Sequence, residues 1–374
     1  MRYPPKAELS GRMQPRRNKE GNTMTTPTQS PLRPGDILDG KYRVDQVLGF
    51  GGMGVVAAAT RLGEGAPEQV AIKCMRSNHR HNGDLDARFR REGRVMFCLR
   101  NEHTVRTLDS GQLDSGLLYI VMELLEGTDL RALVGERTSI SAEEAATYVS
   151  QACEALTEAH ELGIIHRDLK PANLYLTRRA DGSALLKVFD FGIAKLMRPS
   201  AEEDRTKLTV EGQLLGTPHY MAPEQFLNNA IDARTDLWSL GVILYYLVTG
   251  LTPFIGDDPI DLIFNICTNA PRPLRALRPD LPAGFESVVM RCLEKRPEDR
   301  FQSAAELASA LRALTTAPAA SQQLRPGTRD PREQGPAPAR VPERHIRYYV
   351  DPSGSPSWTM TTVHLQQAAP AALT

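Results

Sequence analysis

Two short motifs constrain this chain more than any other feature of its sequence. The first is His166-Arg167-Asp168-Leu169-Lys170-Pro171-Ala172-Asn173, and the second is Asp190-Phe191-Gly192. Transfer of a phosphoryl group from ATP needs a carboxylate near the accepting hydroxyl, ligands for Mg²⁺, and a cation beside the migrating group. Asp168 offers the carboxylate, Asn173 and Asp190 offer the metal ligands, and Lys170 offers the cation. The motifs therefore predict an ATP-dependent phosphotransferase.

The composition excludes several other classes of protein. The 374 residues carry 45 basic and 45 acidic side chains, so no overall charge attracts nucleic acid or an anionic membrane. An apolar content of 41% is enough for one large domain or two ordinary ones. The most apolar run, residues 241–248, is too short to cross a bilayer. We expect neither a nucleic-acid partner nor a membrane segment.

The cysteines point to a reducing compartment. The chain has five of them, widely spaced and in neither a C-x-x-C nor a zinc-ligand pattern. Such scattered cysteines are typical of reduced thiols in a cytosolic protein, and a disulfide or a metal site is the less favoured alternative. The expected location is the cytoplasm.

Local patterning divides the chain into four segments. Residues 1–35 are polar and Pro-rich without apolar periodicity, which predicts a disordered tail. Residues 36–125 show short β-type runs and one helical segment at 86–99, which indicates an antiparallel sheet with one helix. Helical periodicity dominates residues 126–314, and the Pro- and Ala-rich residues 315–374 predict a second disordered tail. The expected fold class is α+β.

Two features of the tails stay open. Either Met1 or Met24 could be the biological start, because Met24 lies shortly before the first strand-like run. In the C-terminal tail, Arg347-Tyr348-Tyr349 and Trp358 are candidates for binding a protein partner, and plain disorder is the alternative.

A glycine-rich stretch lies between two apolar, strand-like runs. It reads Leu48-Gly49-Phe50-Gly51-Gly52-Met53-Gly54-Val55-Val56. Glycine has no Cβ, so the backbone here can close over phosphates and point its N–H groups at them. A simple turn or a Rossmann fingerprint shares this spacing, but the following residues indicate a strand where the Rossmann motif needs a helix. No G-x-x-x-x-G-K-[ST] motif occurs, which excludes a P-loop ATPase.

Lys73 ends the apolar run Val70-Ala71-Ile72, where an isolated buried ammonium group would be unfavourable. The helical segment that follows places Glu92 on the same face as apolar side chains. Glu92 is therefore the predicted partner of Lys73. The alternative is a lysine that extends to solvent and a solvated glutamate.

In this order, the motifs of residues 42–314 resemble the protein kinase catalytic domain, and the Gly-Gly-Met-Gly loop resembles that of bacterial Hanks-type serine/threonine kinases. The resemblance implies the two-lobed protein kinase fold, with a small antiparallel β lobe that contains one helix and a larger, mainly helical lobe. ATP would bind between the lobes. Lys73 would hold its α- and β-phosphates and pair with Glu92, while Asn173 and Asp190 would ligate Mg²⁺.

The resemblance also implies the rest of the nucleotide site. Met122 falls at the gatekeeper position, and the backbone of Glu123 and Leu125 would bond adenine. Tyr175 stands where the family usually has a smaller aliphatic residue beneath adenine, so either the pocket floor is shallower or the ring turns aside. Asp129 lies where some kinases contact the ribose or a basic substrate residue, a role left open here. The full set of expected nucleotide-binding residues is Leu48, Gly49, Phe50, Gly51, Gly52, Met53, Gly54, Val56, Ala71, Lys73, Glu92, Met122, Glu123, Leu125, Tyr175 and Asp190.

The catalytic set implied by the resemblance is Asp168, Lys170, Asn173 and Lys73. Asp168 would orient the acceptor hydroxyl and accept its proton, and Lys170 is typical of the serine/threonine class. His166 is interpreted as a packed structural histidine. With Phe191, Met96 and Leu108 it falls at the positions of the regulatory spine.

Two further positions carry structural roles in the resemblance. Glu224, in Ala222-Pro223-Glu224, would pair with Arg300. Asp236 would lie on a buried central helix and brace the catalytic loop. Residues 216–224 resemble the peptide-binding end of a protein kinase, which disfavours a small-molecule phosphotransferase.

The sequence thus predicts a protein serine/threonine kinase that transfers the γ-phosphoryl of ATP to Ser and Thr hydroxyls of proteins. We also expect autophosphorylation of the activation segment, with Thr209 favoured over Thr206 as the acceptor and Arg167 as the group that meets the phosphate. A dimer would allow that reaction between two chains. The alternatives are that these are ordinary loop hydroxyls and that the chain is a pseudokinase scaffold.

Overall fold

The structure is a computed structural model, and it describes residues 32–51, 54–63, 67–75, 97–113, 115–191, 218–227 and 229–316. These residues all belong to one unit of the chain, residues 1–318. Several predictions fall outside the described residues. They concern residues 1–31 and 317–374 of the predicted tails, the predicted helical segment with Glu92 and Met96, the loop residues Gly52 and Met53, and the segment with Thr206, Thr209 and Thr217. At the described ends of the predicted tails, Leu32 is buried and a helix runs to Thr316.

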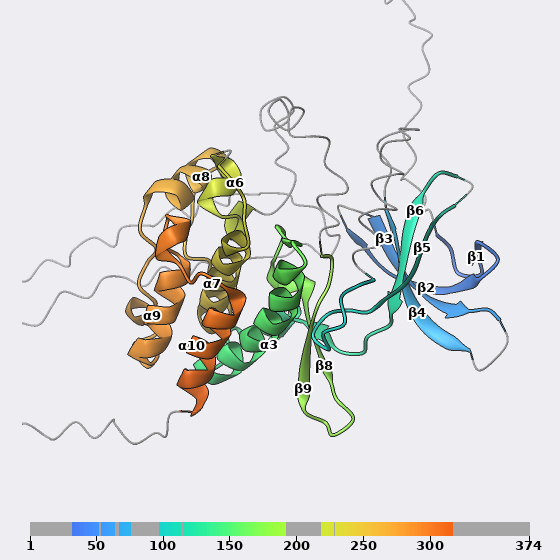
Figure 1. The fold of residues 1–374 in the computed structure, drawn as a ribbon, viewed down its shortest axis with the longest axis horizontal. Coiled ribbons are helices and arrows are strands. Elements are labelled where there is room, and N and C mark those ends of the chain that lie inside the picture. The colour runs from blue at the N-terminus through green and yellow to red at the C-terminus, as the bar shows by residue number, and fades with distance from the viewer. Residues whose placement is uncertain are drawn as a thin grey trace, which may run out of the picture. The chain divides into compact units, whose positions relative to one another are not determined.

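An antiparallel sheet forms the N-terminal part of the fold, with its strands in the order β1-β2-β3-β4-β6-β5 (Figure 1). The strands are β1 Ile37–Leu38, β2 Tyr42–Gly51, β3 Gly54–Arg61, β4 Glu68–Met75, β5 Thr107–Gln112 and β6 Leu118–Glu123. Side chains two apart in a strand share a face. Val55, Ala57 and Ala59 of β3 therefore lie in one buried cluster with Val70 and Ile72 of β4.

The sequence predicted short β-type runs within residues 36–125, and β2, β3, β4 and β6 form on the apolar runs there. β5 was not expected, because its sequence Thr-Leu-Asp-Ser-Gly-Gln has a single large apolar residue. It becomes a strand by pairing along β6, from Thr107 opposite Met122 to Gln112 opposite Leu118. Pairing partners, which are set by the tertiary fold, override local preference here.

Helices dominate the rest of the chain, as the sequence predicted. They are α2 Leu130–Arg137, α3 Ala142–Glu161, α6 Pro223–Phe226, α7 Arg234–Thr249, α8 Pro259–Thr268, α9 Ala283–Cys292 and α10 Ala304–Thr316, with 3₁₀ turns η1 Pro171–Asn173 and η2 Pro218–Tyr220. α7 is apolar on every side and is buried along almost its whole length, which is the pattern of a central helix. It packs against α3, α9 and α10. None of the helices in the described ranges has the length and apolar character needed to span a membrane.

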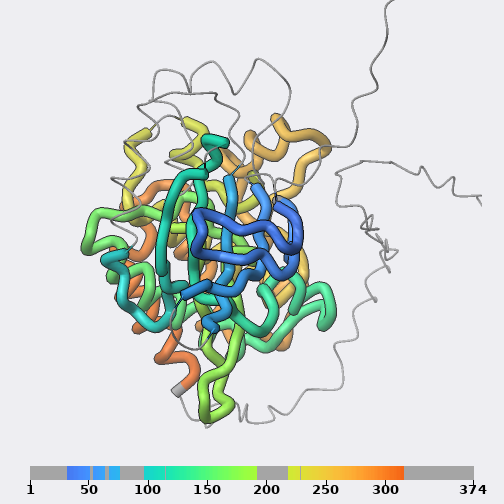
Figure 2. Tube along the Cα trace, turned by 90° about the vertical axis from the view of Figure 1, so that its right-hand side faces the viewer, coloured from blue at the N-terminus to red at the C-terminus, as the bar shows by residue number. Residues whose placement is uncertain are grey.

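A small second sheet joins the two parts. It has the order β7-β8-β9, with β7 Thr128–Asp129, β8 Leu174–Arg178 and β9 Ala184–Val188. Val188 N–H donates to the carbonyl of His103 at 2.8 Å, and Val105 N–H donates to the carbonyl of Val188 at 3.0 Å. The blue strands of the first sheet and the green segments of β8 and β9 can be followed in Figure 2. In this α+β arrangement, Phe189 N–H, just after β9, donates to the carbonyl of Asn173 in η1 at 3.2 Å, so the end of β9 lies beside the segment that follows α3.

Candidate active site

The loop with the first motif follows α3 and runs through η1 into β8. Asp236, in the first turn of α7, is fully buried, and its carboxylate accepts the backbone N–H groups of His166 and Arg167, each at 2.9 Å. His160 Nε2 lies 2.8 Å from the same carboxylate. A buried carboxylate is stable only with such donors, so α7 sets the course of the loop. The predicted bracing role of Asp236 is confirmed.

The side chains of this loop also contact one another. Lys170 Nζ lies 2.7 Å from Asp168 Oδ2, and Asn173 Nδ2 donates to the backbone carbonyl of Asp168 at 2.8 Å. The ammonium and the carboxylate are both partly exposed, whereas Asn173 is buried. The motif therefore presents a carboxylate and a cation together at one accessible place.

Asp190 follows β9 and faces Lys73 of β4. Lys73 Nζ lies 2.5 Å from Asp190 Oδ2, and both side chains are mostly buried. The sequence predicted that Lys73 needs an anionic partner, and among the described residues that partner is Asp190. The pairing with Glu92 remains a prediction, because Glu92 is not among them.

Two residues of the motifs adopt a left-handed backbone although neither is glycine. Arg167 has φ +65° and Asp190 has φ +68°. Such conformations are costly for residues with a Cβ and persist where the surroundings hold them, most often at functional sites. Two of the four described non-glycine residues with such a backbone, Arg167 and Asp190, thus lie in the motifs; the other two are Asp39 and Thr138.

The oxygen atoms at this site fit a divalent cation. Hydrogen bonds from the described residues leave Asn173 Oδ1 and Asp190 Oδ1 unoccupied. Amide and carboxylate oxygens are the ligands that Mg²⁺ prefers, and it commonly takes only one or two of them from a protein. The described residues contain no cluster of three or more His, Cys, Asp and Glu side chains that would make a closed metal site.

The described part of the glycine-rich stretch forms the end of β2 and the start of β3, with Gly51 paired opposite Gly54. Gly54 has φ +154°, and a Cβ on it would collide with the backbone carbonyl of Cys74. Leu48 and Phe50 of β2 are 50% and 64% exposed, which is unusual for large apolar side chains. Exposed apolar side chains and a glycine backbone therefore lie together at the end of β2.

In the segment after β6, some backbone N–H and carbonyl groups form no hydrogen bond with the described residues. Ala71 pairs opposite Met122 and Val56 opposite Lys73, so these predicted residues lie on neighbouring strands. The Glu123 carboxylate is occupied by Lys187 Nζ at 2.7 Å and by the N–H of Arg106 at 2.8 Å. Leu125, in contrast, has a backbone N–H and carbonyl that bond to none of the described residues.

The ring of Tyr175 is tied to this same segment. Its Oη donates to the carbonyl of Gly127 at 2.8 Å, and its ring packs edge-on to Phe189 with centroids 6.5 Å apart. Burial raises the pKa of the Tyr175 phenol. Of the two arrangements considered for Tyr175, this hydrogen bond favours a ring that turns aside.

Asp129 has a local structural role. Its Oδ1 accepts the backbone N–H groups of Arg131 and Ala132, at 2.9 and 3.0 Å, and caps the N-terminus of α2.

Of the four residues predicted at regulatory-spine positions, the structure describes three. The His166 and Phe191 rings pack with centroids 5.1 Å apart, Leu108 packs on the sheet cluster, and Met96 is not described.

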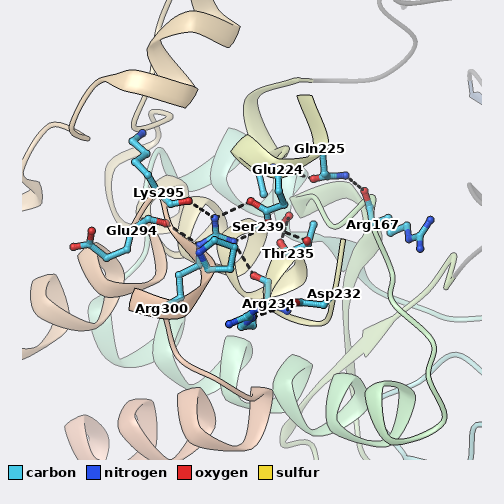
Figure 3. Close-up of polar contacts among 12 residues, drawn as sticks. Arg167, Glu224, Gln225, Asp232, Arg234, Thr235, Ser239, Glu294, Lys295 and Arg300 are labelled. Atoms are coloured by element: carbon cyan, nitrogen blue, oxygen red, sulfur yellow. Dashed lines mark hydrogen bonds and ion pairs between the residues drawn. The ribbon is translucent and has the colours of Figure 1, made fainter. Parts of the chain in front are cut away.

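Glu224 and Arg300 form a fully buried, bidentate ion pair, as predicted. Both N–O distances are 2.8 Å, and Arg300 also donates to the carbonyls of Glu294, Lys295 and Arg234 (Figure 3). Burial alone would raise the pKa of Glu224, but the hydrogen bonds and charge of Arg300 outweigh it and hold this pKa below its ordinary value. Because Thr235 Oγ1 also donates to Glu224 at 2.8 Å and Arg300 donates to the carbonyl of Arg234, the pair and these two bonds fix the start of α6 against α7.

Sequence reasoning missed Gln225. Its side chain contacts both Ala222 and the carbonyl of Arg167, next to Asp168. A glutamine three residues after the cap position is one half of a capping box, which was the available signal, but Ala222 lacks the side-chain oxygen that usually completes it.

The fold has two parts, a β sheet and a helical body, and both sequence motifs contribute residues to the site. The chain belongs to the protein kinase domain family, which it matches over residues 42–311. The resemblance found in the sequence is thereby confirmed.

The relatives of the chain are bacterial serine/threonine kinases. It is 37% identical over 282 residues to serine/threonine-protein kinase pkn3 of Myxococcus xanthus, covering 75% of this chain and 51% of that protein. It is 35% identical over 287 residues to PknB of Mycobacterium tuberculosis, covering 76% and 43%. The chain thus spans about half the length of these relatives.

A solved structure supports the same fold. The crystal structure of the Mycobacterium tuberculosis PknI kinase domain is similar with a TM-score of 0.59 and 29% identity. The match covers 75% of this chain and 99% of that domain. The predicted two-lobed protein kinase fold is confirmed.

Proposed function

We propose that this chain is an active protein serine/threonine kinase that transfers the γ-phosphoryl of ATP to hydroxyls of protein substrates. The observation that carries the proposal is the pair of ion pairs at the two motifs, Lys73 with Asp190 and Lys170 with Asp168, which supply the charges that phosphoryl transfer requires. The motifs are joined by Phe189, beside Asp190, whose N–H donates to the carbonyl of Asn173 at 3.2 Å. The matching family and the named relatives support the choice of ATP and of protein substrates.

In this proposal, Asp168 orients the acceptor hydroxyl and takes its proton. Lys170, 2.7 Å from Asp168, offsets the negative charge of the γ-phosphoryl as it moves. Asn173 fixes the loop through the Asp168 carbonyl, which keeps the carboxylate in place. Because little covalent chemistry falls to the protein in such a reaction, these positioning contacts account for most of the expected rate.

We also propose Asn173 and Asp190 as the ligands of Mg²⁺, through their open oxygens. When bound, Mg²⁺ would neutralise the charge of the ATP phosphates. Lys73 would hold the α- and β-phosphates from β4, and Gly49 to Gly54 would cover them with backbone N–H groups.

The remaining nucleotide contacts follow the same proposal. The open backbone groups of Leu125, with the backbone of Glu123, would bond adenine, beneath Met122 and Ala71 and above Tyr175. Leu48, Phe50 and Val56 would pack on its sides. A ribose or substrate contact by Asp129 is compatible with its capping role, which uses only Oδ1.

Several wider properties belong to the proposal as well. The lobes would span residues 36–125 and 126–314, with tails at 1–35 and 315–374. Tail-mediated protein partners, a dimer for trans-autophosphorylation and a cytoplasmic location are proposed on sequence grounds alone.

The test is phosphate transfer by the purified chain from γ-labelled ATP with Mg²⁺, to itself and to a generic basic protein. We expect transfer by the wild-type chain, phosphoserine or phosphothreonine after acid hydrolysis, and a loss of at least about 10³-fold in Asp168→Asn and Asp190→Asn with the fold retained. Absent transfer by the wild-type chain would favour the pseudokinase alternative. Dominant phosphotyrosine would refute the acceptor class.

A further inference from the structure

The side-chain amide of Gln225 bridges two segments that are far apart in the sequence. Its Oε1 accepts the backbone N–H of Ala222 at 2.9 Å, and its Nε2 donates to the backbone carbonyl of Arg167 at 3.1 Å (Figure 3). An amide offers one acceptor oxygen and one donor nitrogen, and each here meets a backbone group of the opposite kind. The bridge therefore has a defined orientation that a carboxylate cannot reproduce.

Arg167 is held from both sides. Its N–H donates to the buried Asp236 carboxylate at 2.9 Å, and its carbonyl accepts from Gln225. Between these two bonds, the residue keeps a left-handed backbone, with φ +65°. Since such a conformation persists only where the surroundings hold it, losing either bond should let this residue relax.

The carbonyl of Arg167 belongs to the same planar peptide group as the N–H of Asp168. Turning that plane turns the Cα of Asp168 and moves its carboxylate. A shift of the order of 1 Å in a catalytic group is enough to lower a rate by about 100-fold. The position of the Asp168 carboxylate thus depends on a hydrogen bond from outside the catalytic loop.

The other end of the bridge lies in the segment Pro218 to Gln225, which leads into α6. This segment is fixed to α7, because Ser239 Oγ donates to the carbonyl of Tyr220 at 2.8 Å and Thr235 Oγ1 donates to the Glu224 carboxylate at 2.8 Å. It is the segment that resembles the peptide-binding end of a kinase. Gln225 therefore connects the docked state of this segment with the geometry of the catalytic loop.

We propose that Gln225 is a positioning residue that couples the peptide-binding end to the carboxylate of Asp168. The inference rests on the proposed kinase function. Gln225 acts through the Arg167 peptide and touches neither nucleotide nor acceptor. A purely structural role, as a cap of α6, would affect stability without separating kcat from the KM for ATP.

The decisive variant is Gln225→Glu, which has the same shape. It keeps the acceptor for Ala222 but places a carboxylate oxygen against the carbonyl of Arg167. We expect kcat at saturating ATP and substrate to fall by about tenfold or more, with the KM for ATP within about twofold of wild type. Gln225→Leu, which removes both bonds, should lower kcat in the same way and covers the case in which the first variant does not fold.

Gln302→Glu is the matched control. Gln302 is exposed, its Nε2 also donates to a backbone carbonyl, that of Arg300 at 2.8 Å, and its Oε1 accepts from Arg234 at 3.0 Å. We expect its kcat to equal that of wild type. An equal loss of kcat in this control would overturn the inference, because it would report general destabilisation.

Measuring kcat over a series of pH values distinguishes a positioning role of Gln225 from a purely structural one. Protonation of the carboxyl introduced by Gln225→Glu supplies an O–H donor for the Arg167 carbonyl, so its deficit in kcat relative to wild type should shrink as the pH falls. The deficit of Gln225→Leu should stay constant with pH. Wild-type kcat in both folded variants would overturn the inference while leaving the proposed function intact, whereas absent transfer by the wild-type chain would overturn both.

Discussion

The carboxylate of Asp236 accepts the backbone N–H of His166 at 2.9 Å in a place with no solvent exposure. His166 in turn packs its ring on Phe191, and its Nε2 lies 2.9 Å from the carbonyl of Phe189. One buried contact therefore connects the central helix α7 to both motifs that define the site. The geometry of the catalytic loop depends on a residue that takes no part in chemistry.

Asp236→Asn should lower both stability and activity. The introduced amide places N–H groups against backbone N–H donors that need an acceptor, and we expect a loss of about 1–3 kcal/mol in the free energy of unfolding. Chemical denaturation of the purified chain measures this loss. The control is Asp280→Asn, because the Asp280 carboxylate is 62% exposed in its pair with Arg278 and should contribute less than about 1 kcal/mol. Equal losses in the two variants would contradict the bracing role.

Glu224→Gln should be more destabilising than any exposed carboxylate change. It leaves the guanidinium of Arg300, which is 0% exposed, without its counter-charge. Breaking a buried pair from one side costs about 3–5 kcal/mol, because the remaining charge stays desolvated. Glu306→Gln is the control, since Glu306 is 39% exposed in its pair with Arg291. Urea denaturation of both variants compares the two costs, and similar values would show that the buried pair is not a major anchor.

The same pair predicts a pH dependence. Because the folded-state pKa of Glu224 lies below its ordinary value of 4.5, the unfolded chain binds the proton first as the pH falls. The stability from this group is therefore present above about pH 4.5 and is lost as the pH falls through the folded pKa. Thermal unfolding between pH 7 and pH 3 should show a smaller pH-dependent loss in Glu224→Gln than in wild type. Parallel curves for the two proteins would contradict the assignment.

Tyr175→Phe and Tyr175→Leu should have opposite consequences for ATP. In Tyr175→Phe the ring lacks the hydroxyl that bonds to the Gly127 carbonyl, so it can rotate into the floor of the nucleotide pocket. We expect the KM for ATP to rise about fivefold at unchanged kcat, which corresponds to a loss of about 1 kcal/mol in the free energy of ATP binding. Leucine is the size that the family usually has there, and its KM should not exceed that of wild type. Steady-state kinetics over ATP concentration measures both, and equal effects of the two substitutions would mean that the Oη contact has no role.

The sequence predicted that Lys73, Asp168 and Asp190 belong to one site, because the proposed chemistry dictates residue type and spacing. It also predicted β2, β3 and β4, since their sequences contain short apolar runs that favour strands. It could not predict the contacts made between distant segments, such as Tyr175 with Gly127 or Gln225 with Arg167. Those depend on register and packing, as does β5, which is a strand only through its partner.

Arg167 provides the structural basis for a prediction about control. Its Nε is buried without a hydrogen-bond partner, and within the described ranges its guanidinium makes no ion pair. This buried Nε lacks an acceptor, and a phosphate on the activation segment would supply a strong one to the guanidinium. We therefore expect phosphorylation at Thr209, with Thr206 as the second choice, to raise activity.

Phosphopeptide mapping of the active enzyme locates the acceptor, and kinetics of Thr209→Ala, Thr206→Ala and the double variant measure its effect. Because a phosphate orders such a loop through charge-assisted contacts with arginine, the double variant should lose at least about tenfold in kcat/KM. Ser200→Ala, a hydroxyl of the same segment, is the control and should keep full activity. Arg167→Lys retains a charge but not the planar fork, so it should respond weakly to phosphorylation. If the double variant carries no phosphate on this segment and is fully active, control through Arg167 must be abandoned.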